Sequence, residues 1–532
     1  MDYDGTLFIE EIQDLVERGL MSTKRKDVAK AYITYRQERT RIRESSGTYV
    51  KNIENKLNVE NNLMQNANMD EESFGGRMGE ASSANLKEYA LNYCMPKWMA
   101  DLHRNNEIYI HDLDHYALGD HNCLSVPFDK LLANGFNTRQ TDVRPANSVN
   151  TAFQLVAVIF QLQSLNQFGG VSATHLDWTM VPYVRKSFYK HFKDAEKYIF
   201  DDGKVKNYGG PIDDNSYKEN KKAYDYAIDM TEREVYQAVE GMYHNLNTLQ
   251  SRSGNQLPFT SINYGTCTLP EGRMIIKALL DVSIEGIGKL HKTSIFPCGI
   301  FQCMKGVNRD PGNPNYDLFK LALKSTAQRL YPNYANVDWT GNAGYDREDP
   351  RTYFSTMGCR TANGYDINGF GQLKDGRGNI CPVTIILPTI AMETKLAYIN
   401  KYGLEVAIED NSHIIDAFIS ELDEKIDQAK DMLIERFEYI CSQSSASAKF
   451  MWENGTMEGY IPEEGIRSAL RHGTLALGQL GLAECLQILI GKDHTTPEGM
   501  ELAKRIEQLF KDRCAEFKQK YKLNFGVYYT PA

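Results

Sequence analysis

The sequence predicts a protein of the α/β class, and three observations support this prediction. From about residue 85 onward, short apolar runs typical of buried strands alternate with long helical patterns. Strands separated by long helices need crossover connections, which favour parallel pairing. The chain has 532 residues, 42% apolar and 24% charged, so it can bury a large core.

Composition excludes several classes of protein. The net charge is −10 and the basic residues are scattered among acids, so nucleic-acid binding is not expected. The chain has no run of 18 apolar residues and no signal-peptide pattern, which predicts a cytoplasmic protein. Its ten cysteines form no C-x-x-C pair, so neither a zinc ribbon nor a thioredoxin-like motif is expected, and reduced thiols are the default.

The N-terminal part divides by its patterning. Residues 6–44 have the apolar spacing of two helices, and residues 45–75 are polar and rich in Asn and Glu, which predicts a linker. We therefore divide the chain into a helical segment at 1–44, a linker leading into the main domain at 45–84, and the main domain at 85–532.

Within the main domain, residues 216–251 predict a long charged helix. Asn411 or Ser412 is a candidate N-cap of another helix. The better buried segments are residues 156–160 and 384–387.

The most informative segment surrounds Cys359. Gly358 precedes this cysteine and leaves the backbone bare, so the sulfur can sit at a loop tip against a substrate. Met357 lies two residues earlier, and Asn379 lies on a polar turn that leads into an apolar strand bounded by prolines. A single cysteine taken alone is most often a small buried hydrophobic residue.

This segment resembles the active-site region of anaerobic (class III) ribonucleoside-triphosphate reductases. Other segments resemble the same family in order and spacing over about residues 50–532, namely 109–115 with 123–132, 167–172, 251–259, 296–297 with 305–308, and 472–484. The resemblance implies a ten-stranded α/β barrel of the ribonucleotide reductase and glycyl-radical enzyme type. The Cys359 loop would thread into its centre, which would exclude water from a radical.

The resemblance also implies roles for single residues. Cys359 would carry the thiyl radical that removes the 3′ hydrogen of the ribose. Cys123 would face the other side of the sugar and help the 2′-hydroxyl leave as water. Met357 has a polarisable thioether and Asn379 has an amide that can hold a hydroxyl or formate, and together they favour formate as reductant.

A phosphate-binding region is expected near the C-terminal end. Residues 472–481 supply glycines and free backbone N–H groups ahead of a helix, an arrangement that can bind a triphosphate. His472, Gly473 and Thr474 are the candidates, and Thr530 resembles the start of a further phosphate-side turn. A glycine-rich helix start is common, and without the family context it indicates packing.

The resemblance implies cofactors and partners as well. They are ribonucleoside triphosphates, ATP and dNTP effectors, a second copy of the chain, and an activating enzyme that uses S-adenosylmethionine to make a glycyl radical. Residues 1–44 resemble the closing helices of an ATP-cone, although a helical hairpin that caps the barrel is an equally open interpretation. Family members continue with four zinc-binding cysteines and the radical glycine. A gene split by an intervening element, a two-subunit enzyme and an incomplete reading of the gene are all open explanations for this difference. We expect a separate polypeptide that carries both features as a partner, so this chain alone should be inactive and bind no zinc.

Two other functions stay open. A pyruvate formate-lyase-like acyltransferase typically has two adjacent cysteines at the loop tip, whereas Gly358 and Arg360 flank a single one here. A non-catalytic nucleotide-binding remnant is the second alternative.

Two local patterns could mislead. His111, His115, His121 and Cys123 could be written as a zinc site, but the first two follow a strand-like run that would not bring them together. The string from Arg360 to Gly364 and Tyr365 mimics a glycyl-radical sequence, and we expect it to be a buried turn beside Cys359.

Overall fold

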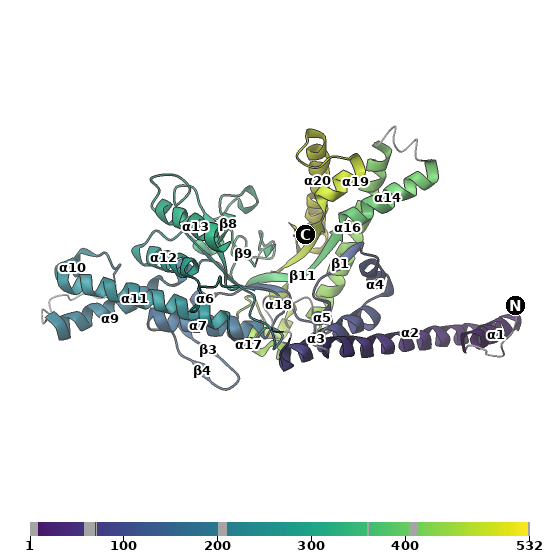
Figure 1. Cartoon of the computed structure of the whole chain (residues 1–532), viewed down its shortest axis with the longest axis horizontal. Helices are drawn as coiled ribbons and strands as arrows, with labels where there is room; N and C mark the ends of the chain where they lie inside the picture. Colours follow the sequence, from purple (N-terminus) through teal and green to yellow (C-terminus); the bar gives the residue numbers. More distant parts are fainter. Residues whose placement is uncertain are drawn as a thin grey trace.

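The computed structural model describes residues 9–57, 70, 72–200, 210–358, 361–403 and 412–529. Within these ranges the chain has a mixed α/β fold around one curled, half-barrel sheet (Figure 1). The described sheet has nine strands in the order β13-β12-β11-β2-β5-β6-β7-β8, with β1 pairing β11 beside this path. Their bounds are Ile108–Ile110 (β1), Cys123–Ser125 (β2), Val171–Ala173 (β5), Thr260–Tyr264 (β6), Cys298–Cys303 (β7), Asn333–Asn336 (β8), Arg377–Ile386 (β11), Thr474–Leu480 (β12) and Asn524–Tyr529 (β13).

The strands form two parallel sets that meet in antiparallel orientation. β2, β5, β6, β7 and β8 are mutually parallel, and so are β11, β12 and β13. β2 and β11 pair antiparallel where the sets join. The expected parallel pairing is therefore confirmed within each set and wrong at the junction and between β1 and β11, which also pair antiparallel. A crossover helix constrains only strands that follow one another in the chain, and β2 and β11 do not.

Gly378 allows β11 to approach β2 closely at this junction. A Cβ atom at this position would lie 1.9 Å from the carbonyl oxygen of Cys123. The register then places Asn379 directly opposite Cys123, and the pairing with β12 shifts between Asn379 and Cys381. The junction therefore brings together two residues that are far apart in the chain.

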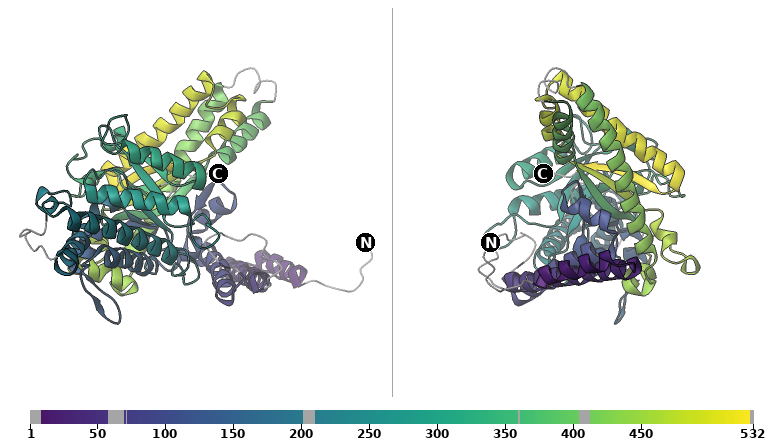
Figure 2. Two further views of the ribbon diagram at one scale, coloured as in Figure 1. Left: turned by 60° about the vertical axis from the view of Figure 1, so that its left-hand side comes forward. Right: turned by 90° about the vertical axis from the view of Figure 1, so that its right-hand side faces the viewer.

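Helices cover both sets of strands (Figures 1 and 2). A connected layer beside the first set consists of α7 (Val149–Ser164), α9 (Val181–Asp194), α11 (Lys221–Leu246), α12 (Pro270–Glu285) and α13 (Tyr316–Arg329). Beside the second set lie α14 (Leu387–Tyr402), α16 (Ser412–Cys441), α19 (Leu482–Ile490) and α20 (Pro497–Tyr521). Shorter helices are α4 (Lys97–Arg104), α5 (Leu113–Tyr116), α6 (Phe128–Asn134), α8 (Leu176–Thr179), α10 (Asn215–Lys218), α17 (Lys449–Asn454) and α18 (Arg467–Leu470).

The helices expected in the main domain are present. The predicted charged helix corresponds to α10 followed by α11, and the helix expected after Asn411 or Ser412 is α16, although Asn411 itself lies outside the described residues. The two buried apolar runs differ in structure, since residues 156–160 lie in α7 and residues 384–386 end β11. Short apolar runs do not by themselves distinguish helix from strand. None of the helices within the described ranges is long and apolar enough to span a bilayer.

The N-terminal part forms α1 (Ile9–Ser22), α2 (Lys26–Leu57) and α3 (Phe74–Tyr89). The two helices predicted for residues 6–44 are confirmed from residue 9 onward. However, α2 continues through the first part of the predicted linker and projects away from the sheet (Figure 1). Its Glu, Arg and Lys residues are polar but favour helix, and Lys56 near its end pairs with Glu80 on α3 at 2.9 Å.

Candidate active site

A short hairpin leads to the cysteine that the sequence singles out. β9 (Thr356–Met357) pairs antiparallel with β10 (Thr361–Ala362). Cys359 and Arg360 between them lie outside the described residues, as does Thr530. Gly358 has a φ of +68°, and a Cβ atom there would lie 2.6 Å from the Phe259 ring. The position before Cys359 therefore requires glycine for both conformation and space.

Polar side chains of two neighbouring strands hold this hairpin. Asn263 on β6 accepts the Thr356 N–H at 3.0 Å through Oδ1 and donates to the Thr356 carbonyl at 3.0 Å through Nδ2. Ser172 Oγ on β5 donates to the same carbonyl at 3.0 Å. Ser261 Oγ accepts the Gly358 N–H at 3.0 Å. These three side chains were not predicted, although polar residues in a buried strand were a signal that could have found them.

Cys123 lies next to the hairpin at the sheet junction. Its Sγ accepts the Gly170 N–H at 3.2 Å and donates to Asn122 Oδ1 at 2.7 Å. A Cβ atom on Gly170 would lie 3.7 Å from the Gly358 nitrogen, so the two predicted cysteine segments are close in space. Burial raises the pKa of Cys123 to about 11. The side chain is therefore a thiol at neutral pH, which suits hydrogen donation rather than nucleophilic attack.

Three of the predicted site residues form one row across the sheet. Cys123 on β2 pairs with Asn379 on β11, and Asn379 pairs with Thr474 on β12. The Asn379 side chain donates to Asn122 Oδ1 at 3.4 Å. Its Oδ1 is buried and has no hydrogen-bond partner among the described residues. Buried acceptors are nearly always paired in proteins, so this oxygen is available to a ligand hydroxyl or N–H group.

Met357 is also part of this centre. Its side chain is buried, and its sulfur accepts a long contact of 4.0 Å from Asn363 Nδ2. Asn363 in turn donates to the carbonyls of Lys374 and Arg377 at 3.1 and 3.0 Å. The thioether is therefore held between the hairpin and the start of β11.

Residues 472–481, expected to offer glycines and free backbone N–H groups to a triphosphate, are mostly a strand. Residues 474–480 are the strand β12, which pairs with β11 on one side and β13 on the other. Only Gly481, with φ +78°, separates this strand from α19. The expectation of free backbone N–H groups is wrong for residues 474–480, because the sheet ladder takes up these groups.

His472 is bound within the protein. Its Nδ1 lies 2.8 Å from Asp366 Oδ2, and its ring stacks on Phe370 with centroids 4.0 Å apart. Asn524 donates to the other Asp366 oxygen at 2.7 Å, and the Arg377 Nε donates to the His472 carbonyl at 2.8 Å. Its imidazole therefore joins the start of β12 to the turn before β11.

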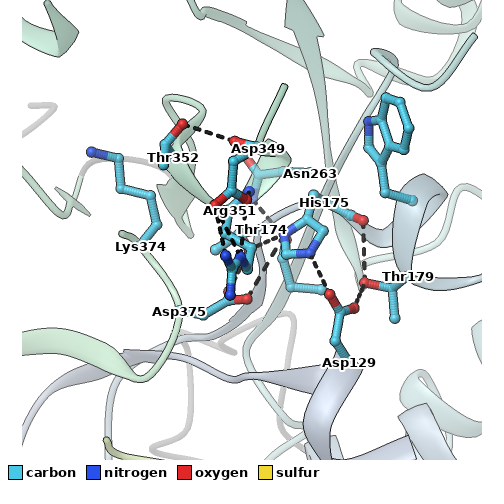
Figure 3. A network of polar contacts seen from close by, with 12 residues as sticks. Asp129, Thr174, His175, Thr179, Asn263, Asp349, Arg351, Thr352, Lys374 and Asp375 are labelled. Atoms are coloured by element: carbon cyan, nitrogen blue, oxygen red, sulfur yellow. Dashed lines mark hydrogen bonds and ion pairs between the residues drawn. The ribbon is translucent and has the colours of Figure 1, made fainter. Parts of the chain in front are cut away.

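A buried polar network lies at the end of β5, close to the hairpin (Figure 3). His175 Nε2 is 3.0 Å from Asp129 Oδ2, and Nδ1 is 2.7 Å from Thr174 Oγ1. Thr174 Oγ1 donates to Asp375 Oδ1 at 2.5 Å. Burial opposes the charged imidazole, but the two carboxylates together raise the pKa of His175 to about 9. Burial raises the pKa of Asp375 to about 6 despite the nearby imidazole. The sequence did not predict this network.

The structure bears on the two local patterns noted in the sequence, the histidine and cysteine group at residues 111–123 and the string that contains Gly364. His111 Nε2 is 2.7 Å from Thr384 Oγ1, whereas His115 Nδ1 is 2.7 Å from Asp120 Oδ2, so these rings have separate partners. In the part of the chain that the structure describes, no three His, Cys, Asp or Glu side chains could hold a metal ion together. Gly364 is exposed, so the prediction that its string would be a buried turn is wrong. It follows β10.

Comparison with known proteins identifies families and relatives that this chain resembles. A family model described as anaerobic ribonucleoside-triphosphate reductase matches residues 65–532, and a model of the ATP cone domain matches residues 1–41. The anaerobic ribonucleoside-triphosphate reductase of Haemophilus influenzae is 28% identical over 543 residues, which cover 100% of this chain and 70% of that protein. The protein of the same name from Enterobacteria phage T4 is 29% identical over 496 residues, which cover 91% of this chain and 73% of that protein.

Solved structures share the fold. The anaerobic ribonucleotide reductase of Thermotoga maritima with dATP bound in its specificity site has a TM-score of 0.59 at 14% identity, covering 99% of this chain and 78% of that chain. The same enzyme in complex with dATP and CTP has a TM-score of 0.57 at 16% identity, covering 86% of this chain and 69% of that chain. The mixed α/β fold is therefore similar to that of anaerobic ribonucleotide reductases.

Proposed function

The chain belongs to the anaerobic ribonucleoside-triphosphate reductase family, and on that premise we propose that it reduces ribonucleoside triphosphates by thiyl-radical chemistry with formate as reductant. Enzymes of this family are oxidoreductases that act on ribonucleotides. In the proposed reaction, a ribonucleoside triphosphate, formate and a proton give the deoxyribonucleoside triphosphate, carbon dioxide and water. Formate supplies the two electrons that replace the 2′-hydroxyl with hydrogen.

One observation carries this proposal. Cys123 and Asn379 are paired across the β2–β11 junction, and the hairpin that leads to Cys359 is held beside them. In our proposal Cys359 removes the 3′ hydrogen, and the Cys123 thiol gives its hydrogen to the departing 2′-hydroxyl. The high pKa of Cys123 supports the second role, because only the protonated sulfur can donate. Removing the 3′ hydrogen first makes the loss of water feasible.

Formate as reductant rests on two side chains. The Met357 thioether is buried and fixed in the hairpin, where a polarisable sulfur can share electron density with an adjacent sulfur radical. The Oδ1 of Asn379, which has no hydrogen-bond partner in the described part of the chain, supports a contact with a sugar hydroxyl. Formate or that hydroxyl would occupy the space between Asn379 and Cys123.

The remaining features of the proposal concern triphosphate binding, assembly and activation. Thr474 lies in register with Asn379, which supports a substrate site near the start of β12, and binding of the triphosphate by His472, Gly473, Thr474 and Thr530 stays a prediction. We also propose closure into a ten-stranded barrel, a homodimer, activation by a radical S-adenosylmethionine enzyme that forms a glycyl radical, and ATP and dNTP effectors. The match of residues 1–41 to the ATP cone supports the effectors. A cytoplasmic location stays a prediction.

The decisive experiment replaces Cys359 by serine in the radical-bearing holoenzyme. Cys359→Ser should abolish deoxynucleotide formation and leave nucleotide binding within about twofold, since oxygen cannot perform the abstraction but fills the same space. Cys441→Ser on α16 is the matched control and should keep its activity. Labelled formate should appear as carbon dioxide in step with product. Retained turnover in Cys359→Ser, or equal turnover with a dithiol and no formate, would contradict the proposal.

A further inference from the structure

Asp112 has an unusual backbone and an unusual partner. Its φ of +56° is left-handed, a region that costs a non-glycine residue about 1 kcal/mol or more. It occupies the N-cap position of α5, yet its side chain makes no capping hydrogen bond. The carboxylate accepts a hydrogen bond from Asn122 Nδ2 instead. The strained backbone therefore aims an acid at a neighbour of Cys123 rather than at its own helix.

The Asn122 amide is shared between this acid and the candidate active site. Its Nδ2 faces Asp112, and its Oδ1 accepts from the Cys123 thiol at 2.7 Å and from Asn379 Nδ2 at 3.4 Å. In these two contacts Cys123 and Asn379 both donate, and the amide accepts from them only in this orientation. A flipped amide would turn its NH2 group toward two donors and leave its oxygen against the carboxylate.

A carboxylate is the side chain that makes this orientation obligatory. Burial raises the pKa of Asp112, while the hydrogen bond from Asn122 and the positive charge of Arg252 act in the opposite direction and favour the carboxylate. In this ionised form Asp112 can only accept hydrogen bonds, so it admits the NH2 side of Asn122 and rejects the oxygen side. The Arg252 guanidinium lies nearby and acts electrostatically on both Asp112 and Cys123. Arg252 is itself held by the Phe168 carbonyl at 2.6 Å and by Gln256 Oε1 at 2.7 Å. A fixed cation therefore partly balances the half-buried acid.

We propose that Asp112 is a positioning residue: its carboxylate fixes the Asn122 amide with the oxygen toward Cys123 and Asn379, and so sets the direction of the Cys123 S–H bond. This inference rests on the proposed function, in which Cys123 gives its hydrogen to the substrate. Asp112 acts through Asn122 and has no contact of its own with the Cys123 sulfur among the hydrogen bonds of the described residues.

The test uses the radical-bearing holoenzyme and three variants. In Asp112→Asn the new amide can present either its oxygen or its NH2, so the orientation of Asn122 is no longer imposed. We expect kcat for deoxynucleotide formation to fall about tenfold, the equivalent of one lost hydrogen bond, with the KM for the nucleotide within about twofold. Asn122→Asp places two carboxylates next to each other, and its kcat should fall further than that of Asp112→Asn. In the exchange variant Asp112→Asn/Asn122→Asp, the carboxylate at position 122 offers oxygen to Cys123, and the amide at position 112 donates its NH2 to that carboxylate. Its kcat should recover to within about threefold of the parent.

Asp114→Asn is the matched control. Asp114 is a buried acid on the same helix, bonded to Ser83 Oγ at 2.7 Å rather than to the site, and its variant should keep kcat within about twofold. Recovery in the exchange variant also separates positioning from general damage to the fold. Equal kcat in Asp112→Asn and the parent, or no recovery in the exchange variant, would overturn the proposal.

A second readout does not depend on turnover. The S–H stretching band of Cys123 can be assigned by infrared difference against Cys123→Ser. In Asp112→Asn the band should move to higher frequency, because the S–H···O bond to Asn122 weakens, and in the exchange variant it should return. An unshifted band overturns the positioning role even if the parent reduces no ribonucleotide. A shifted band with an inactive parent supports the positioning role and contradicts the proposed function.

Discussion

The network around His175 predicts a loss of stability in alkaline solution. Its pKa is about 9 in the folded protein against an ordinary 6.5, because Asp129 and Asp375 outweigh the effect of burial. Between these two pH values the folded state holds a proton that the unfolded chain releases. The stabilisation is therefore complete below about pH 6.5 and is lost as the pH rises through 9. The interval corresponds to about 3 kcal/mol of unfolding free energy.

The perturbation is His175→Gln. Glutamine can still hydrogen-bond to Asp129 and Thr174 but does not titrate. The variant should therefore have a lower unfolding free energy than the parent at pH 6.5, and that free energy should lose the part of its pH dependence that comes from His175. The unfolding free energies of the parent and the variant are measured by equilibrium urea denaturation at constant ionic strength. Tryptophan fluorescence follows the unfolding at several pH values between 6.5 and 9. His494→Gln, at an exposed histidine, is the control and should retain the parent's slope. Identical slopes in His175→Gln and the parent would refute the reasoning.

Three further predictions follow from the site geometry. Asn263→Asp keeps the bond from the Thr356 N–H but turns an acceptor toward the Thr356 carbonyl, so kcat should fall at least tenfold with nucleotide binding retained, as measured by steady-state kinetics and equilibrium binding. Gly378→Ala should lower the unfolding free energy by about 2 kcal/mol or more, since the new Cβ would meet the Cys123 carbonyl, whereas Gly364→Ala has open space and should be neutral; thermal denaturation compares them. Alkylation of Cys123 by iodoacetamide, followed by mass spectrometry, should accelerate about tenfold per pH unit up to pH 10, and a plateau near pH 8 would show that burial does not protect its proton.

The sequence predicted the parts of the site that depend on local chemistry. Gly358 before a lone cysteine indicated a tight loop, and the structure has a left-handed residue there with no room for a side chain. The β-branched run after Asn379 predicted a buried strand, and it is β11. These predictions succeeded because backbone conformation and apolar patterning are set by neighbouring residues.

Where the structure differs from the sequence-based predictions, the deciding contacts join residues that are distant in the chain. Residues 474–480 were expected to offer free backbone N–H groups to a triphosphate, but β11 and β13 flank them and make them a strand. Gly364 was expected to be buried, yet the hairpin turns it outward. The network of Asp129, His175 and Asp375 joins three elements that no local pattern relates.

The sequence by itself therefore determined the local structure and the candidate reactive residues. These are an α/β alternation, a cysteine at a loop tip bordered by glycine, and a second cysteine with candidate partners. Only the tertiary structure decided that Cys123 pairs with Asn379 and that Asn263 hydrogen-bonds to the hairpin. It also decided that Asp112 is linked to Cys123 by hydrogen bonds through Asn122. The physical reason is the antiparallel junction between two parallel sets of strands. Its register depends on packing between remote segments and on the missing side chain of Gly378, and neither can be calculated from neighbouring residues alone.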